Sequence, residues 1–188
     1  KEVRSPLHGI TGIIEILSAT SLNNQQQEYI HMVRECSAEL LHIINNIIDY
    51  TKILEGRLTP VDKVNDMNAC IKQTKNIITS KMPKHKIKVD YNIPTFDEKY
   101  LFDMNRLQQV LINLMTNAVD NTKEGGVTLN ITKEQKNQEY DVIKFEVVDT
   151  GRGIDVDDIK KLFKPFCKLK QHDHHNKIGL GLLITKHI

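Results

Sequence analysis

The chain has 188 residues, of which 27% are charged and 39% are hydrophobic, and its formal net charge is +2 at pH 7. This length suits one large domain or two small ones, and the composition is that of an ordinary soluble protein with enough apolar material for a core. The nearly balanced charge provides no basic field of the kind that nucleic-acid-binding proteins need, so we expect no nucleic-acid partner.

The first predicted element is an amphipathic helix over residues 2–19, followed by a polar break at residues 21–24. Its apolar residues follow alternating steps of four and three, which places them on one stripe of a helix. The stripe comprises Val3, Leu7, Ile10, Ile14 and Leu17.

A much longer helix is predicted over residues 25–54. Heptad positions a and d are filled without a gap by Val33, Cys36, Leu40, Ile43, Ile47, Tyr50 and Leu54. A second stripe beside the first comprises Ile30, Leu41, Ile44 and Ile48. This face is wider than a coiled-coil seam, and a helix of roughly 45 Å is too long for one short partner to cover. We therefore predict an antiparallel hairpin that forms a four-helix bundle in a homodimer.

The domain boundary is expected after Gly56, which can end the long helix, in the proline-containing stretch 57–66. Beyond it the pattern changes to mixed helices and strands. Helices are predicted at 67–79, at 104–121 and from 179 onward, and strands at 87–91, 99–102, 127–132 and 142–148. The predicted fold class is α+β, with a helical hairpin over residues 1–57 and a two-layer α/β sandwich over residues 58–188.

The cysteines and the hydropathy indicate the cellular compartment. Cys36, Cys70 and Cys167 are widely spaced and form no CxxC pair, so reduced structural thiols are the simplest interpretation. No apolar run reaches the length of a membrane span, and no segment resembles a signal peptide. We expect a cytoplasmic location, as a free protein or as the cytosolic portion of a membrane-bound one.

Two asparagines give the first chemical signal. Asn113 and Asn117 lie four residues apart on a predicted helix, so both amides project from one face. Two amides on an otherwise apolar helix are costly unless they have partners. A hard cation such as Mg²⁺, with its water ligands and bound phosphates, would satisfy their oxygens, and hydrogen bonds from the helix to a loop would do so equally well.

Two glycine-containing turns follow. Asp149 ends a predicted strand and can accept a hydrogen bond from an exocyclic amine, while Gly151 and Gly153 would let the backbone approach a flat ring. An ordinary tight turn explains this motif as well. Gly179 and Gly181 open a helix, whose free N–H groups suit phosphates.

Together these segments resemble the N, G1 and G2 boxes of the histidine kinase ATP-binding domain, in the gyrase, Hsp90, histidine kinase and MutL superfamily. Residues 162–166 are similar to the F box, residues 2–7 resemble the H box, and residues 48–56 resemble the end of the second dimerisation helix. The resemblance to a sensor histidine kinase core covers nearly the whole chain. The chain begins within the H-box-like motif and stops within a predicted helix, so we expect both of its ends to be cut from a longer protein.

The resemblance implies ATP and Mg²⁺ as cofactors. Asn117 would be a Mg²⁺ ligand and Asn113 would contact the phosphates. Asp149 would bind the adenine amino group, and Gly151 and Gly153 would line the adenine pocket.

The phosphate end of the site is implied in the same way. Gly179 and Gly181 would hold phosphate under a mobile lid over residues 167–178. Two positions depart from the family pattern: Asp120 stands where a lysine is usual, and Lys177 replaces the first glycine of Gly-x-Gly-x-Gly. Lys177 could supply a replacement cation, whereas a carboxylate at Asp120 would repel phosphate unless it turns away or holds the metal.

The phosphoacceptor position also departs from the family. The family phosphorylates the histidine before the H-box glutamate, and Lys1 stands there. Two alternatives are open: either Lys1 is the natural residue and the usual acceptor is missing, or the natural protein has a histidine at this position. His8, seven residues later on nearly the same face, is a weak substitute. Glu2 and Ser5 keep the spacing of the residues that, in the family, assist proton transfer and dephosphorylation of the partner.

Three functions remain open. The preferred one is an ATP-dependent histidine kinase that relays phosphate to an aspartate of a response-regulator receiver domain, in cis or in trans. The second is a degenerate kinase that acts as a dimeric scaffold, which the residues at 1, 120 and 177 favour. The third is another ATPase of the superfamily. Those enzymes activate water with a glutamate where this chain has Asn113, so we rank this reading last.

Overall fold

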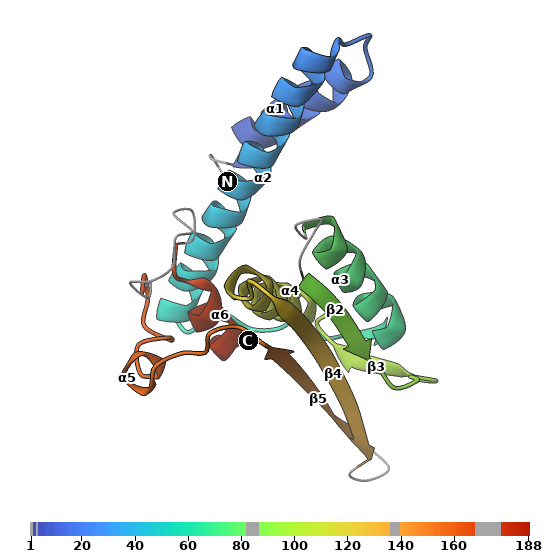
Figure 1. Ribbon diagram of the computed structural model, residues 1–188, viewed down its shortest axis with the longest axis vertical. Helices are drawn as coiled ribbons and strands as arrows, with labels where there is room; N and C mark the ends of the chain where they lie inside the picture. Colours follow the sequence, from blue (N-terminus) through green and yellow to red (C-terminus); the bar gives the residue numbers. More distant parts are fainter. Residues whose placement is uncertain (1, 3, 82–86, 136–139, 168–177) are drawn as a thin grey trace. The chain divides into compact units, whose positions relative to one another are not determined.

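The computed structural model describes residues 2, 4–81, 87–135, 140–167 and 178–188 (Figure 1). The chain divides into two compact units, Lys1–Arg57 and Leu58–Ile188. The first is helical and the second contains a sheet, which confirms the predicted α+β class. Among the described helices, none combines the length and the apolar character needed to cross a membrane.

The first unit is an antiparallel hairpin of α1 (Arg4–Ser18) and α2 (Asn24–Leu54). Asn23 caps α2 through a reciprocal capping box, in which its side chain accepts from the Gln26 backbone N–H and its own N–H donates to the Gln26 side chain. Two hydrogen bonds join the helices, one near each end of α1. Arg4 donates to Asn45 at 2.7 Å, and Arg34 donates to Ser18 at 2.8 Å.

The hairpin buries only part of its apolar surface. Leu7 and Ile14 of α1 are buried, whereas Ile10 and Leu17 of the same predicted stripe remain exposed. On α2, Arg34 and Asn45 mark the face turned toward α1. The heptad stripe lies on another side of α2 and is mostly open, with exposed fractions of 47% for Val33, 46% for Leu40 and 45% for Ile47. Its members Ile43 and Tyr50 are half-buried.

The second unit contains two sheets. The larger has the order β2-β4-β5 and consists of β2 (Ile87–Asn92), β4 (Gly125–Gln135) and β5 (Asp141–Asp149). Strand β2 is parallel to β4, and β4 is antiparallel to β5. The smaller sheet pairs β1 (Lys63–Asp66) with β3 (Lys99–Phe102) in antiparallel register. The helices are α3 (Met67–Lys81), α4 (Met104–Asn121), α5 (Val156–Ile159) and α6 (Gly181–His187).

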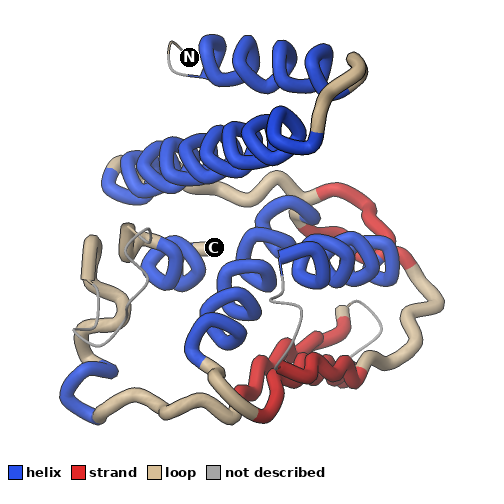
Figure 2. Tube along the Cα trace, turned by 45° about the horizontal axis from the view of Figure 1, so that its top comes forward, coloured by secondary structure: helices blue, strands red, loops and turns tan. Residues whose placement is uncertain are grey.

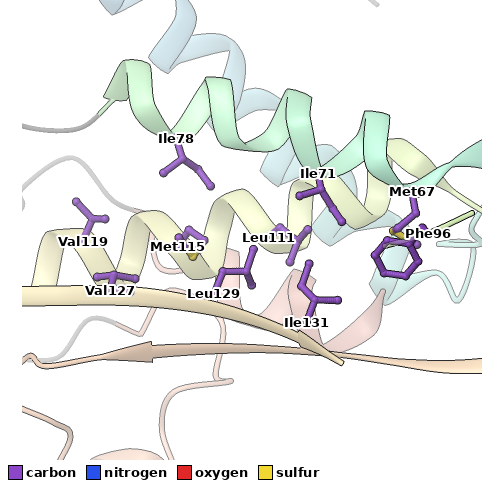
Figure 3. Packing of buried hydrophobic residues seen from close by; sticks show 11 residues of the cluster. Met67, Ile71, Ile78, Phe96, Leu111, Met115, Val119, Val127, Leu129 and Ile131 are labelled. Carbon is purple, nitrogen blue, oxygen red and sulfur yellow. The ribbon is translucent and has the colours of Figure 1, made fainter. Parts of the chain in front are cut away.

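Helices α3 and α4 pack on one face of the larger sheet, which gives the unit two layers (Figures 2 and 3). Alternate residues of β4 (Val127, Leu129 and Ile131) point into this layer and are buried, as the two-residue period of a strand requires. Leu111 and Met115 of α4 are fully buried opposite them. The other face of the sheet is polar, with Asn92 donating to Asn130 at 2.7 Å.

Leu111→Ala should strongly destabilise the second unit. The Leu111 side chain is 0% exposed, so its removal leaves a cavity that lowers the free energy of unfolding by about 2–5 kcal/mol. Cys70 reports the opening of this unit, because burial raises the pKa of its thiol to about 11 and shields it from alkylation. Alkylation of Cys70, followed by mass spectrometry, should become about 30-fold faster or more.

Leu101→Ala is the matched control, because Leu101 is 70% exposed on β3 and its loss leaves no cavity. Its effect should stay within about 0.5 kcal/mol, and Cys70 should be alkylated at nearly the native rate. Equal rates of Cys70 alkylation in the two variants would mean that burial of Leu111 does not stabilise the second unit.

Candidate functional site

Helix α4 carries the two asparagines on the side opposite its buried residues. It begins at Asp103, whose carboxylate accepts a hydrogen bond from the Arg106 backbone N–H at 3.1 Å. Its apolar side fills the core, and Asn113 and Asn117 lie half-buried on the remaining surface. Asn117 Nδ2 donates to Asn113 Oδ1 at 3.5 Å, so the two amides share one face of the helix.

The glycine pair near the end of the chain packs against Asn113. Asn113 Nδ2 donates to Thr185 Oγ1 of α6 at 2.8 Å. An added Cβ at position 181 would collide with Asn113 Oδ1, so a larger residue there would displace the Asn113 side chain. One N–H of Asn113 is thus satisfied inside the fold by a second helix, and not by the loop that the sequence interpretation considered.

The turn before α6 also requires glycine. Gly179 has a φ of +79°, and a Cβ there would lie 2.6 Å from the carbonyl oxygen of Cys167. Cys167 directly follows the F-box-like segment 162–166. Lys186 of α6 places its Nζ 5.1 Å from the centre of the Phe163 ring. The turn, α6 and the F-box-like segment are therefore held together.

The second glycine turn lies at the end of β5. Asp149 is exposed there, and its Oδ1 accepts from the Gly151 backbone N–H at 2.9 Å. A Cβ at Gly151 would lie 2.6 Å from the backbone oxygen of Asn121, the last residue of α4. Gly153 has a φ of +73°. This turn is therefore pressed against the C-terminal end of α4.

Thr150, between Asp149 and Gly151, joins this turn to the start of β4 and to Glu124 just before it. Its Oγ1 accepts from the Gly126 N–H at 3.0 Å and donates to the Glu124 carbonyl at 3.1 Å. Its own backbone N–H donates to Gly126 at 3.1 Å. The sequence interpretation missed Thr150, since its partners lie more than twenty residues away, although its place inside the motif is a signal that could have drawn attention to it.

Two turns that are distant in sequence, the Asp149 turn and the Gly179–Gly181 turn, thus converge on α4, which carries the asparagine pair. Glu2, Ser5 and His8 belong to the first unit and are exposed, Ser5 and His8 on α1 and Glu2 just before it. Lys1 and Lys177 lie outside the described residues. Asp120 is exposed near the end of α4.

The polar groups of this site are of the chemical types that Mg²⁺ and a nucleotide require. Amide oxygens on α4 are hard ligands of the kind that Mg²⁺ accepts, and the Asp149 carboxylate is an acceptor for an amine. The two turns bring backbone close to α4 where side chains would obstruct it.

Comparison with known proteins finds two family matches. Residues 1–56 match the His Kinase A (phospho-acceptor) domain, and residues 102–188 match the histidine kinase-, DNA gyrase B-, and HSP90-like ATPase. The peroxide stress-activated histidine kinase mak1 of Schizosaccharomyces pombe is 29% identical over 192 residues, which are 100% of this chain and 12% of that protein. The aerobic respiration control sensor protein ArcB of Escherichia coli is 29% identical over 193 residues, or 100% of this chain and 24% of ArcB.

Solved structures agree with these matches. Full-length ShkA in complex with AMPPNP superposes with a TM-score of 0.69 at 26% identity, covering 98% of this chain and 38% of ShkA. The catalytic domain of histidine kinase ThkA superposes with a TM-score of 0.53 at 27% identity, covering 68% of this chain and 79% of that domain. The chain carries both segments of a sensor histidine kinase core and belongs to the histidine kinase family.

Proposed function

We propose that the chain is the core of an ATP-dependent histidine kinase that relays phosphate to an aspartate of a response-regulator receiver domain, in cis or in trans. The convergence of the two glycine turns on the asparagine pair of α4 is the observation that carries this proposal. The chain spans 12% of the length of mak1 and 10% of the length of hybrid signal transduction histidine kinase B of Dictyostelium discoideum. The activity and the partners of the whole protein are therefore proposed here.

The second unit, residues 58–188, would bind ATP and Mg²⁺. Asn117 would be a Mg²⁺ ligand, Asn113 would contact phosphate, and Asp149 would accept from the adenine amine. The remaining contacts would come from Gly151, Gly153, Gly179, Gly181 and Lys177. Mg²⁺ would neutralise phosphate charge, and the chain would contribute mostly by positioning the reactants. Binding of AMPPNP by ShkA supports the nucleotide assignment.

The first unit, residues 1–57, would form a homodimer and carry the phosphoacceptor. The open heptad stripe on α2 supports this assignment, because one hairpin leaves it facing water. A second copy packed against it would complete a four-helix bundle. Glu2 would assist proton transfer from the acceptor, and Ser5 would help dephosphorylate the partner.

A degenerate kinase is the second candidate. Lys1 stands at the expected acceptor position, and a lysine does not accept phosphate in the same chemistry. Asp120 stands on α4 in place of the usual lysine. In this alternative the hairpin would signal as a dimeric scaffold, and nucleotide would at most shift its conformation.

Asp149→Asn should weaken ATP binding at least about tenfold. The Gly151 N–H occupies one side-chain oxygen, so the amide would present its N–H to the adenine amine where the carboxylate offers a second oxygen. Isothermal titration calorimetry with ATP and Mg²⁺ measures the change. Asp157→Asn on α5 is the control, an equal change of charge on an exposed residue, and should bind like the parent. Equal affinities for all three proteins would refute the adenine assignment, and no binding by the parent would refute the nucleotide site.

Autophosphorylation separates the two candidate functions. The intact natural protein, incubated with labelled ATP and Mg²⁺, should acquire an acid-labile and alkali-stable label on a histidine at or near the start of α1. Peptide mapping and the variant His8→Gln identify the labelled position. ATP binding without any label would instead support the degenerate kinase.

Leu40→Glu should dissociate the dimer, because it places a carboxylate in the apolar interface from both copies. We expect dimerisation to weaken by more than about 100-fold, measured by analytical ultracentrifugation. Ala38→Glu is the matched control, since it introduces the same carboxylate at an exposed residue two positions away, on nearly the opposite side of α2. A monomeric parent, or equal weakening by both variants, would contradict the proposed interface.

A further inference from the structure

Helix α6 places a hydroxyl beside the asparagine pair. Leu183 and Ile184 of this helix are buried, at 8% and 1% exposure, and the helix packs against α4. Thr185 follows them and is half-buried, with its Oγ1 2.8 Å from Asn113 Nδ2. Its partner lies 72 residues earlier in the chain, so the contact exists only in the folded unit.

The Asn113 amide turns its nitrogen to Thr185 and its oxygen toward Asn117. A hydroxyl can donate or accept, so this orientation depends on Thr185 accepting and on Asn117 donating. The nitrogen and oxygen ends of an amide have nearly the same shape, so hydrogen bonds decide its orientation. With its nitrogen on Thr185, Asn113 turns its oxygen toward Asn117 Nδ2, 3.5 Å away. Rotating the Asn113 amide alone would set the two nitrogens against each other.

The resulting row of amides has a direction. Asn117 donates to Asn113, and Asn113 donates to Thr185. The nitrogen of Asn117 is thereby committed toward Asn113, which turns its oxygen to the other side of its amide. Mg²⁺ takes oxygen ligands, so this direction matches the proposed role of Asn117.

We propose that Thr185 is a positioning residue of the nucleotide site: its hydroxyl anchors Asn113, and through Asn113 it orients the amide of Asn117 toward Mg²⁺. The inference rests on the proposed function of the asparagine pair. Thr185 acts through Asn113 and is assigned no contact with the nucleotide. Losing the hydroxyl should therefore affect the metal-dependent part of binding and spare the adenine part.

Thr185→Val removes the hydroxyl at nearly constant shape, and Thr185→Ser keeps it. The magnesium concentration that half-saturates the increase in ATP affinity should rise about 5–10-fold in the valine variant and stay within about twofold in the serine variant. In excess chelator the loss of ATP affinity in the valine variant should be smaller than the loss with magnesium, because only the proposed Asn113 contact to phosphate is then affected. Thr116→Val is the matched control, because the Thr116 hydroxyl donates to the Ile112 carbonyl of α4 at 2.7 Å.

A second readout needs no nucleotide. The side-chain amide signals of Asn113 in a ¹H–¹⁵N NMR spectrum, assigned with Asn113→Ala, report the hydrogen bond directly. Thr185→Val should shift these signals and speed their exchange with solvent, and Thr185→Ser should restore them. Thr116→Val should leave them in place.

The outcomes separate the inference from the function on which it rests. If the parent binds ATP but Thr185→Val leaves the magnesium dependence unchanged, the positioning role is refuted. Equal losses of affinity with and without magnesium would refute it too, because they would indicate general damage to α6. If the parent binds no ATP, the proposed function fails and the inference fails with it, whatever the amide signals show.

Discussion

The amphipathic character of α4 is the constraint on which the second unit depends. One side of this helix fills the core with Leu111 and Met115, and the other presents Asn113 and Asn117. The core contacts fix the rotation of the helix, because turning it would bury two amides and expose fully packed side chains. The same packing that stabilises the unit therefore aims the asparagines, and the two glycine turns are fitted against that helix.

The first unit obeys a different constraint. Its hairpin covers Leu7 and Ile14 but leaves the heptad stripe of α2 open, so a single copy has no closed core of its own. Each unit would thus meet a different requirement of the proposed kinase. One would supply a preorganised nucleotide site, and the other an apolar surface whose burial would couple two copies.

The sequence predicted the periodic elements well, because apolar spacing records which side of a helix or strand is buried. It missed β1, a short strand of mostly polar residues (Lys63–Asp66). This strand pairs with β3 through backbone hydrogen bonds, which leave no apolar pattern in the sequence. It named the asparagines and glycines but neither Thr150 nor Thr185, since both act through partners far along the chain. Two apolar stripes on α2 were visible, yet only the fold tells which of them α1 leaves open.

The central claim is that α4 and the two glycine turns packed against it form one nucleotide site, and a titration followed by ¹H–¹⁵N NMR tests it most directly. Addition of a non-hydrolysable ATP analogue with Mg²⁺ should shift the backbone amide signals of Asn117, Gly151 and Gly181 along one common binding curve. Shifts at these three positions with different midpoints, or shifts confined to residues away from α4, would contradict the account.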